Sequence, residues 1–262
     1  MRAYAINSIE SQLRGQRTPP RNPPPVNSIA AVAWAGPNRL VSGCEHQVAE
    51  SGKSAKMLLV HKAMLFDLGR VLVHFDFRRG YEALEKDCGI PAADIPRRLA
   101  PTGLVERFET GLIEPRPFFD EFRRILELDL EYARFCEIWS CIFTHQILPQ
   151  EMLEGLHRRY RMVLLSNTNA LHFEMIRQWY APLLSQFDEL VLSYEVGAMK
   201  PRPEIFDRAI QAAQCAPVEC FYTDDIAPYV EAARAKGIDA VLFESREQLE
   251  SALRARSITW HV

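Results

Sequence analysis

Five short apolar segments of the chain predict the strands of a parallel sheet. Continuous apolar runs of this kind fit strands that are buried on both faces, because helices cover both sides of such a sheet. Patterns with helical spacing follow three of the segments, and strands that alternate with helices predict a doubly wound, Rossmann-like α/β fold. The segments are residues 63–67, 162–166, 189–193, 220–224 and 240–243.

Residues 79–148 interrupt this alternation. They contain no further buried-strand run, and their apolar residues recur at helical spacing. We therefore expect an all-helical cap at 79–148, inserted into a core made of 57–78 and 149–262. A helical insert at this place is a candidate lid over the active site. We interpret its large aromatic residues as cap core rather than as a stacking platform for a ligand; they are Phe118, Phe122, Trp139 and Phe143.

Residues 1–56 differ in composition from the rest of the chain. Five prolines lie between positions 19 and 25. Proline removes backbone hydrogen-bond donors and restricts φ, which favours extended, solvated chain. We predict that this segment is a disordered extension, with a functional tail as the alternative, and Met57 and Met64 leave open that the natural start of the protein lies later.

Charge and cysteine content narrow the classes of partner. The formal net charge is −3, so there is no electrostatic reason to expect nucleic acid or an anionic membrane as a partner. No apolar run approaches the roughly 20 residues that span a bilayer. The six cysteines form no CxxC pair, and scattered cysteines are typical of small buried residues in a reducing compartment. We expect a cytoplasmic protein, either a monomer or a homodimer.

Candidate chemistry gathers at the carboxyl ends of the predicted strands. Ligands of open parallel sheets bind at this edge. Carboxylates packed together without a cation would repel one another and take up protons, whereas Mg²⁺ binds carboxylates, a carbonyl, waters and a substrate phosphate. The set therefore suits phosphoryl transfer, which needs a nucleophile, a divalent cation and fixed donors for the phosphoryl oxygens. Its members are Asp67, Ser166, Asn167, Lys200, Asp224 and Asp225.

Four motifs occur in a characteristic order along this part of the chain. They are residues 66–72 (FDLGRVL), 164–169 (LLSNTN), 200–206 (KPRPEIF), and 222–225 (YTDD) followed by 230–234 (VEAAR). The set resembles the four motifs of the haloacid dehalogenase-like superfamily. The match covers roughly the last 200 residues, and the helical insert is similar to the small cap of the family's first subclass.

The resemblance implies a function for each matching residue. Asp67 is expected to attack phosphorus and form an aspartyl-phosphate that water then hydrolyses. Ser166 and Asn167 are expected to bind the phosphoryl oxygens, and Lys200 to neutralise charge on the nucleophile and the phosphate. The implied Mg²⁺ ligands are Asp67, the backbone carbonyl of Gly69, Asp225, and Asp224 directly or through water. We expect a phosphatase that hydrolyses a small phosphorylated metabolite, with a sugar phosphate as the first choice.

Two residues depart from the family pattern. Most phosphatases of the family carry a second aspartate two residues after the nucleophile, which protonates the leaving group, and this chain has Gly69 there. General acid catalysis contributes about 10²–10⁴-fold, so the departure favours good leaving groups, as in sugar 1-phosphates, or a substitute donor. Asp76 and His74 are candidate donors, although Asp76 equally fits the turn into the first insert helix and His74 a solvated edge. Tyr229 replaces a common asparagine, and we expect it to loosen one contact behind the site.

Two other functions stay open. A 2-haloacid dehalogenase on the same fold also lacks the second aspartate but needs no metal, and the pair Asp224 and Asp225 argues against it. Gly69 and Tyr229 favour a binding protein that kept the fold and lost the chemistry, whereas an intact Asp67 and Lys200 favour catalysis.

Substrate choice is expected to lie in the insert. Several of its charged residues are candidate substrate contacts, and a solvated helix face is the alternative interpretation. They are Arg78, Arg79, Arg107 and Glu109.

Overall fold

The computed structural model describes residues 60–261, which contain a five-stranded parallel sheet. Its strands are β1 (Ala63–Phe66), β4 (Arg161–Ser166), β5 (Glu189–Leu192), β6 (Cys220–Asp224) and β7 (Asp239–Leu242). They lie in the order β5-β4-β1-β6-β7, and every neighbouring pair is parallel. All five apolar segments are therefore strands, and the prediction of a doubly wound α/β core is confirmed.

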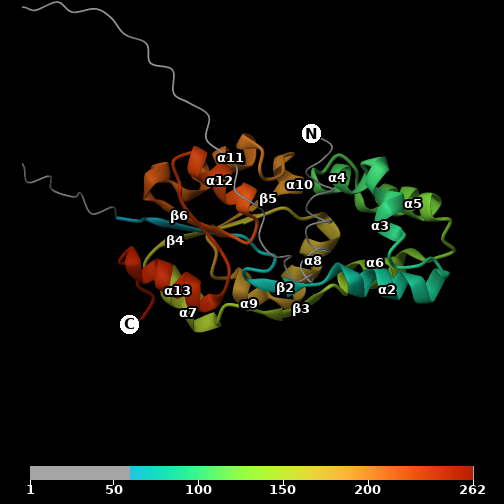
Figure 1. Ribbon diagram of the computed structural model, residues 1–262, viewed down its shortest axis with the longest axis horizontal. Helices are drawn as coiled ribbons and strands as arrows, with labels where there is room; N and C mark the ends of the chain where they lie inside the picture. Colours follow the sequence, from blue (N-terminus) through green and yellow to red (C-terminus); the bar gives the residue numbers. More distant parts are fainter. Residues whose placement is uncertain (1–59, 262) are drawn as a thin grey trace, which may run out of the picture. The chain divides into compact units, whose positions relative to one another are not determined.

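Helices cover both faces of this sheet (Figure 1). One layer contains α7 (Gln150–His157), α8 (Ala170–Trp179), α9 (Ala181–Leu184) and α13 (Arg246–Ala255). The other contains α11 (Pro203–Ala213) and α12 (Ala227–Ala235). Two short helices lie in the connections: α10 (Ser193–Val196) directly follows β5, and η2 (Pro217–Glu219) directly precedes β6. Side chains alternate between the two layers along each strand. In β1, Met64 and Phe66 pack with the first layer and Leu65 with the second.

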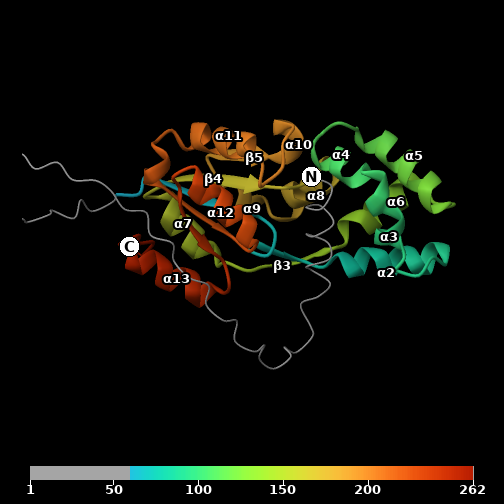
Figure 2. The ribbon, with the colours of Figure 1, turned by 45° about the horizontal axis from the view of Figure 1, so that its top comes forward.

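A ribbon of two antiparallel strands joins the core to a group of helices. The ribbon strands are β2 (Val73–Phe75) and β3 (Phe143–Gln146). Figures 1 and 2 both show the helices between them beside the sheet, at the far end of the ribbon. These cap helices are α2 (Phe77–Cys88), α3 (Ile95–Leu99), α4 (Leu104–Glu109), α5 (Pro115–Leu126) and α6 (Tyr132–Ser140), with a turn of 3₁₀ helix, η1 (Ala100–Thr102).

The cap has an aromatic core of its own. Phe118, Phe122 and Trp139 are buried in one cluster between the helices, and their rings pack edge-on or tilted, as aromatic rings prefer. Phe143 is also buried but packs with the core domain instead. The interpretation as cap core is therefore confirmed for Phe118, Phe122 and Trp139 and is wrong for Phe143, which belongs to the hydrophobic core of the sheet domain.

The structure corrects the expected all-helical insert at both ends. The first cap helix begins at Phe77, before position 79, and β3 lies inside the range expected to be helical. The sequence of β3 is Phe-Thr-His-Gln, with two exposed residues in its middle. Such a strand has no continuous apolar run, so only its pairing with β2 reveals it.

Three further expectations concern parts of the chain outside the sheet. The predicted disordered extension, residues 1–56, lies outside the described residues. Within residues 60–261, no helix combines the length and apolar character needed to cross a bilayer. The described cysteines form no disulfide, and the expectation that they are buried holds for Cys220 alone, since the other four are partly exposed.

Candidate active site

Lys200 lies at the centre of a buried charge cluster at the carboxyl edge of the sheet. Its Nζ donates to Asp67 Oδ1 at 2.7 Å and to Asp224 Oδ2 at 2.7 Å. A third hydrogen bond reaches the carbonyl of Leu165 at 3.0 Å. Asp67 directly follows β1, Asp224 is the last residue of β6, and Leu165 lies in β4. These three strands are neighbours in the sheet. Lys200 is only 3% exposed, and a buried ammonium group of this kind needs such a full set of partners.

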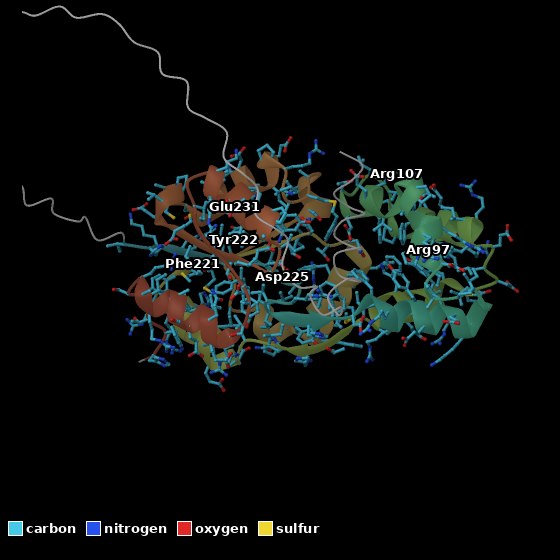
Figure 3. The ribbon with its side chains drawn as sticks, in the orientation of Figure 1. Arg97, Arg107, Phe221, Tyr222, Asp225 and Glu231 are labelled. Atoms are coloured by element: carbon cyan, nitrogen blue, oxygen red, sulfur yellow. The ribbon has the colours of Figure 1, made fainter. Side chains whose placement is uncertain are left out.

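Asp225, which follows β6 and is labelled in Figure 3, adds a third carboxylate to this cluster. Carboxylate oxygens of Asp67, Asp224 and Asp225 lie within 4.8 Å of one another. Burial raises the pKa of Asp67 to about 8, and the charges of the other two carboxylates add to this effect while Lys200 opposes it. Burial and the Asp224 charge raise the pKa of Asp225 to about 6. Carboxylates that repel one another in this way are stabilised by further positive charge, and an all-oxygen donor set fits Mg²⁺.

The three carboxylates differ in how many of their oxygens are already engaged. Asp224 is fully buried. Its Oδ2 accepts from Lys200 and from the Tyr222 hydroxyl, and its Oδ1 accepts from the Ile226 amide at 2.8 Å. Asp225 is partly exposed. The geometry therefore favours Asp225 over Asp224 as a direct ligand position, and Asp224 fixes the lysine.

Ser166 and Asn167, at the end of β4, differ in their side-chain contacts. Ser166 is 2% exposed, and its hydroxyl makes only a long 3.5 Å contact with the carbonyl of Asn167. The side chain of Asn167 holds the backbone of Lys200: Oδ1 accepts from its amide at 2.8 Å, and Nδ2 donates to its carbonyl at 3.0 Å. The Ser193 hydroxyl, at the start of α10, bonds both the amide and the carbonyl of Thr168 at 2.9 Å. The second and third sequence motifs are thus tied together.

Comparison with protein families agrees with this arrangement. The family model described as haloacid dehalogenase-like hydrolase matches residues 61–237. The chain belongs to this family. Among curated relatives, D-ribitol-5-phosphate phosphatase of Bacteroides thetaiotaomicron is 30% identical over 197 residues, which cover 68% of this chain and 89% of that protein. A phosphatase of Mycobacterium tuberculosis is 27% identical over 200 residues, which cover 71% of this chain and 88% of that protein.

Solved structures of haloacid dehalogenase-like enzymes share the fold. A crystal structure of a family enzyme from Bacteroides thetaiotaomicron has a TM-score of 0.67 at 28% identity and covers 74% of this chain and 99% of that one. The same enzyme in complex with magnesium and inorganic phosphate gives a TM-score of 0.66 at 28% identity. The fold and the family are therefore established, and this chain is a hydrolase of the haloacid dehalogenase-like type.

Two tyrosines complete the site and were not predicted as part of it. The ring of Tyr222 lies 5.9 Å from Lys200 Nζ and that of Tyr229 5.3 Å from it, so both rings face the ammonium group. The Tyr229 hydroxyl also lies 3.4 Å from Asn167 Nδ2. The expectation that Tyr229 loosens one contact behind the site stays a prediction, and the structure adds that its ring faces the lysine. A signal existed for Tyr222, since a tyrosine in a buried strand needs a partner for its hydroxyl.

The position of the usual family acid is filled by another side chain. A Cβ atom on Gly69 would overlap the ring of Phe75, so the structure leaves no room there for an aspartate. Asp76 is the N-cap of α2, where it accepts from the Arg78 amide at 3.0 Å and pairs with its guanidinium at 2.7 Å. The hydrogen bonds with Arg78 hold the pKa of Asp76 below its ordinary value. His74 bonds Thr144 Oγ1 at 2.8 Å on an exposed edge. Both residues therefore have the structural positions considered for them: Asp76 caps the first insert helix, and His74 lies on an exposed edge.

Proposed function

We propose that this chain is a Mg²⁺-dependent phosphatase that hydrolyses a small phosphorylated metabolite through an aspartyl-phosphate on Asp67. The observation that carries the proposal is the buried contact of Asp67 with Lys200, at 2.7 Å, beside two further carboxylates. The phosphatase names of two relatives, and the magnesium and phosphate bound in a related structure, support it. Because one relative acts on D-ribitol 5-phosphate, a sugar or polyol phosphate is the preferred substrate class.

The chain's own residues account for the first half of this reaction. Lys200 donates to Oδ1 of Asp67, which favours the charged carboxylate against the effect of burial and orients it for attack on phosphorus. The Asp67–phosphorus bond forms while the bond from phosphorus to the leaving oxygen breaks. The Ser166 hydroxyl and the backbone amide of Asn167 would donate to phosphoryl oxygens, and Lys200 would offset the charge of these oxygens.

A divalent cation fits the same pocket. We propose Asp67, Asp225 and the backbone carbonyl of Gly69 as its ligands, with Asp224 contributing directly or through water. Bound Mg²⁺ would supply positive charge to the phosphoryl group and to the three carboxylates.

Hydrolysis of p-nitrophenyl phosphate tests the proposal, because its leaving group needs no protonation. We expect turnover with Mg²⁺ and its loss in EDTA. Asp67→Asn is expected to lower kcat by about 10³-fold or more, since the variant lacks the nucleophile. Asp94→Asn, which changes a carboxylate in the cap, is the matched control and should keep wild-type activity.

Two results would point to the other functions. Halide release from a 2-haloacid that persists in EDTA would indicate a dehalogenase. Turnover of neither substrate would indicate a binding protein. A screen of phosphorylated sugars and polyols with wild type and Asp67→Asn would then define the substrate.

A further inference from the structure

The site described above holds a nucleophile and an anion-binding set but no proton donor for the leaving group. Gly69 carries no side chain, and Phe75 fills the adjacent space. Asp76 is bound to the Arg78 guanidinium. A phosphatase that acts on esters with poor leaving groups needs such a donor, because general acid catalysis contributes about 10²–10⁴-fold.

Glu109, the last residue of α4, is a carboxylate without a partner in the described part of the chain. It takes part in no ion pair and no side-chain hydrogen bond among residues 60–261. On the same helix, Arg107 pairs with Glu121 at 2.7 Å, which leaves that arginine unavailable as its partner. Glu109 is also only partly exposed, so its free carboxyl group is not an ordinary surface charge.

The turn after Glu109 rests against the core next to the catalytic edge. A Cβ atom on Gly111 would overlap the carbonyl oxygen of Tyr194, so the cap and core backbones touch at this point. Tyr194 belongs to α10, whose first residue, Ser193, holds the Thr168 backbone in the loop after β4. Glu109 is two residues from this contact, and we therefore place it at the carboxyl edge of the sheet.

The charge of Glu109 acts on both domains. Burial and then the Glu109 carboxylate raise the pKa of Tyr81, in α2 of the cap, to about 12. Burial also raises the pKa of Tyr229, in α12 of the core, to about 12, with a contribution from Glu109. Tyr229 is also one of the two rings that face the central ammonium group, at 5.3 Å from Lys200 Nζ. Burial and the Glu106 charge raise the pKa of Glu109 itself to about 7.

We propose that Glu109 is the general acid and base of this enzyme, supplied by the cap in place of the missing aspartate. The inference rests on the proposed phosphatase function. In the first step Asp67 bonds to phosphorus, the phosphorus–oxygen bond of the ester breaks, and the Glu109 proton goes to the leaving oxygen. In the second step Glu109, now a carboxylate, takes a proton from water as the water oxygen bonds to phosphorus. The bond between phosphorus and Asp67 breaks, and inorganic phosphate, Asp67 and protonated Glu109 result.

Two aryl phosphates of similar size test this assignment. Phenyl phosphate releases a phenol whose pKa is about 10, like that of a tyrosine side chain, whereas p-nitrophenyl phosphate releases a much more acidic phenol. We expect Glu109→Gln to lower kcat/KM by about 10²-fold or more for phenyl phosphate, and by less than about 3-fold for p-nitrophenyl phosphate, whose leaving group needs no acid. A burst of one nitrophenolate per enzyme is expected as well, because the second step loses its base.

The controls separate a proton-transfer function from binding or folding. Glu114→Gln removes an exposed carboxylate of the cap that makes no capping hydrogen bond, and it should change the activity on both substrates by less than about 2-fold. Glu109→Asp keeps the carboxyl group and should lose less activity on phenyl phosphate than Glu109→Gln, with thermal unfolding reporting whether each variant is folded. Equal losses of Glu109→Gln on both substrates, or no loss on either, would overturn the assignment. If wild type turns over neither substrate, or if Asp67→Asn is as active as wild type, the phosphatase proposal itself fails.

Discussion

Gly69 and Phe75 determine the local geometry beside Asp67. The ring of Phe75 occupies the space next to the Gly69 Cα and also lies 5.3 Å from the Arg70 guanidinium. Arg70 has a φ of 60°, a conformation uncommon for a residue with a side chain. Its charge partly offsets the effect of burial on the pKa of Asp225. Gly69, Arg70 and Phe75 therefore shape this turn together.

The first residue-scale prediction concerns this packing. Gly69→Ala is expected to lower the free energy of unfolding by about 1–3 kcal/mol, because its methyl group overlaps the Phe75 ring. The double variant with Phe75→Leu should lose less free energy of unfolding than the sum of the two single variants, because the smaller side chain leaves room for the methyl group. Urea denaturation of wild type, the two single variants and the double variant measures these free energies. Losses that add to within about 0.5 kcal/mol would contradict the packing.

At the scale of elements, the start of α2 decides what Asp76 does. Its backbone is extended, with φ −139° and ψ 107°, and its side chain accepts from the Arg78 amide. This is the geometry of an N-cap, which satisfies one of the unpaired amides of the first turn. The helix ends at Gly89, which has a φ of 70°, a conformation that glycine adopts without strain. The residue between the ribbon strand β2 and the cap helix α2 is therefore occupied as a helix cap.

Asp76→Ala should test this assignment. It removes the N-cap and is expected to lower the free energy of unfolding by about 0.5–2 kcal/mol. Asp76→Asn keeps a capping oxygen and should cost less. Both variants should keep the wild-type kcat on phenyl phosphate at acidic and neutral pH, because Asp76 transfers no proton. A tenfold fall in kcat for Asp76→Asn, in a chain of unchanged stability, would restore Asp76 as a proton donor.

For the described part of the molecule as a whole, His172 links the core to the cap. The amide Nδ2 of Asn169, in the loop after β4, donates to His172 Nδ1 at 3.0 Å. His172 Nε2 then donates to the carbonyl of Trp139, in the cap helix α6, at 2.9 Å. An amide nitrogen can only donate and a carbonyl can only accept, so these partners require the neutral ring with its proton on Nε2. Burial lowers the pKa of His172 to about 4.

This link predicts a pH-dependent stability. The unfolded chain binds a proton near the ordinary pKa of 6.5 and the folded chain only near 4. The contribution of neutral His172 is therefore complete above pH 6.5 and is lost as the pH falls from 6.5 through about 4. The loss is about 3 kcal/mol, at about 1.4 kcal/mol per pKa unit.

The comparison with His172→Gln isolates this contribution. Free energies of unfolding from urea titrations at a series of pH values should show a smaller acid-side decline for the variant than for wild type. Carboxylates affect both chains equally, so parallel curves would mean that His172 is protonated in the folded protein.

Local sequence pattern alone determined the five strands of the parallel sheet, the family and the residues of the candidate site. Each of these five strands is a run of apolar residues, and each motif is contiguous, so neighbouring residues carry the information needed. That Asp67 and Asp224 would lie close together also followed, because parallel strands end at one edge of a sheet.

Tertiary structure alone decided how those residues are paired. The hydrogen bond from Lys200 to Asp67 joins residues 133 positions apart, and it depends on β1 lying between β4 and β6. The packing of Tyr229 on Lys200, the strand β3 and the place of Glu109 depend in the same way on contacts between distant segments. No periodicity in the sequence encodes such contacts, because they arise from the path of the chain and from the docking of the cap on the core.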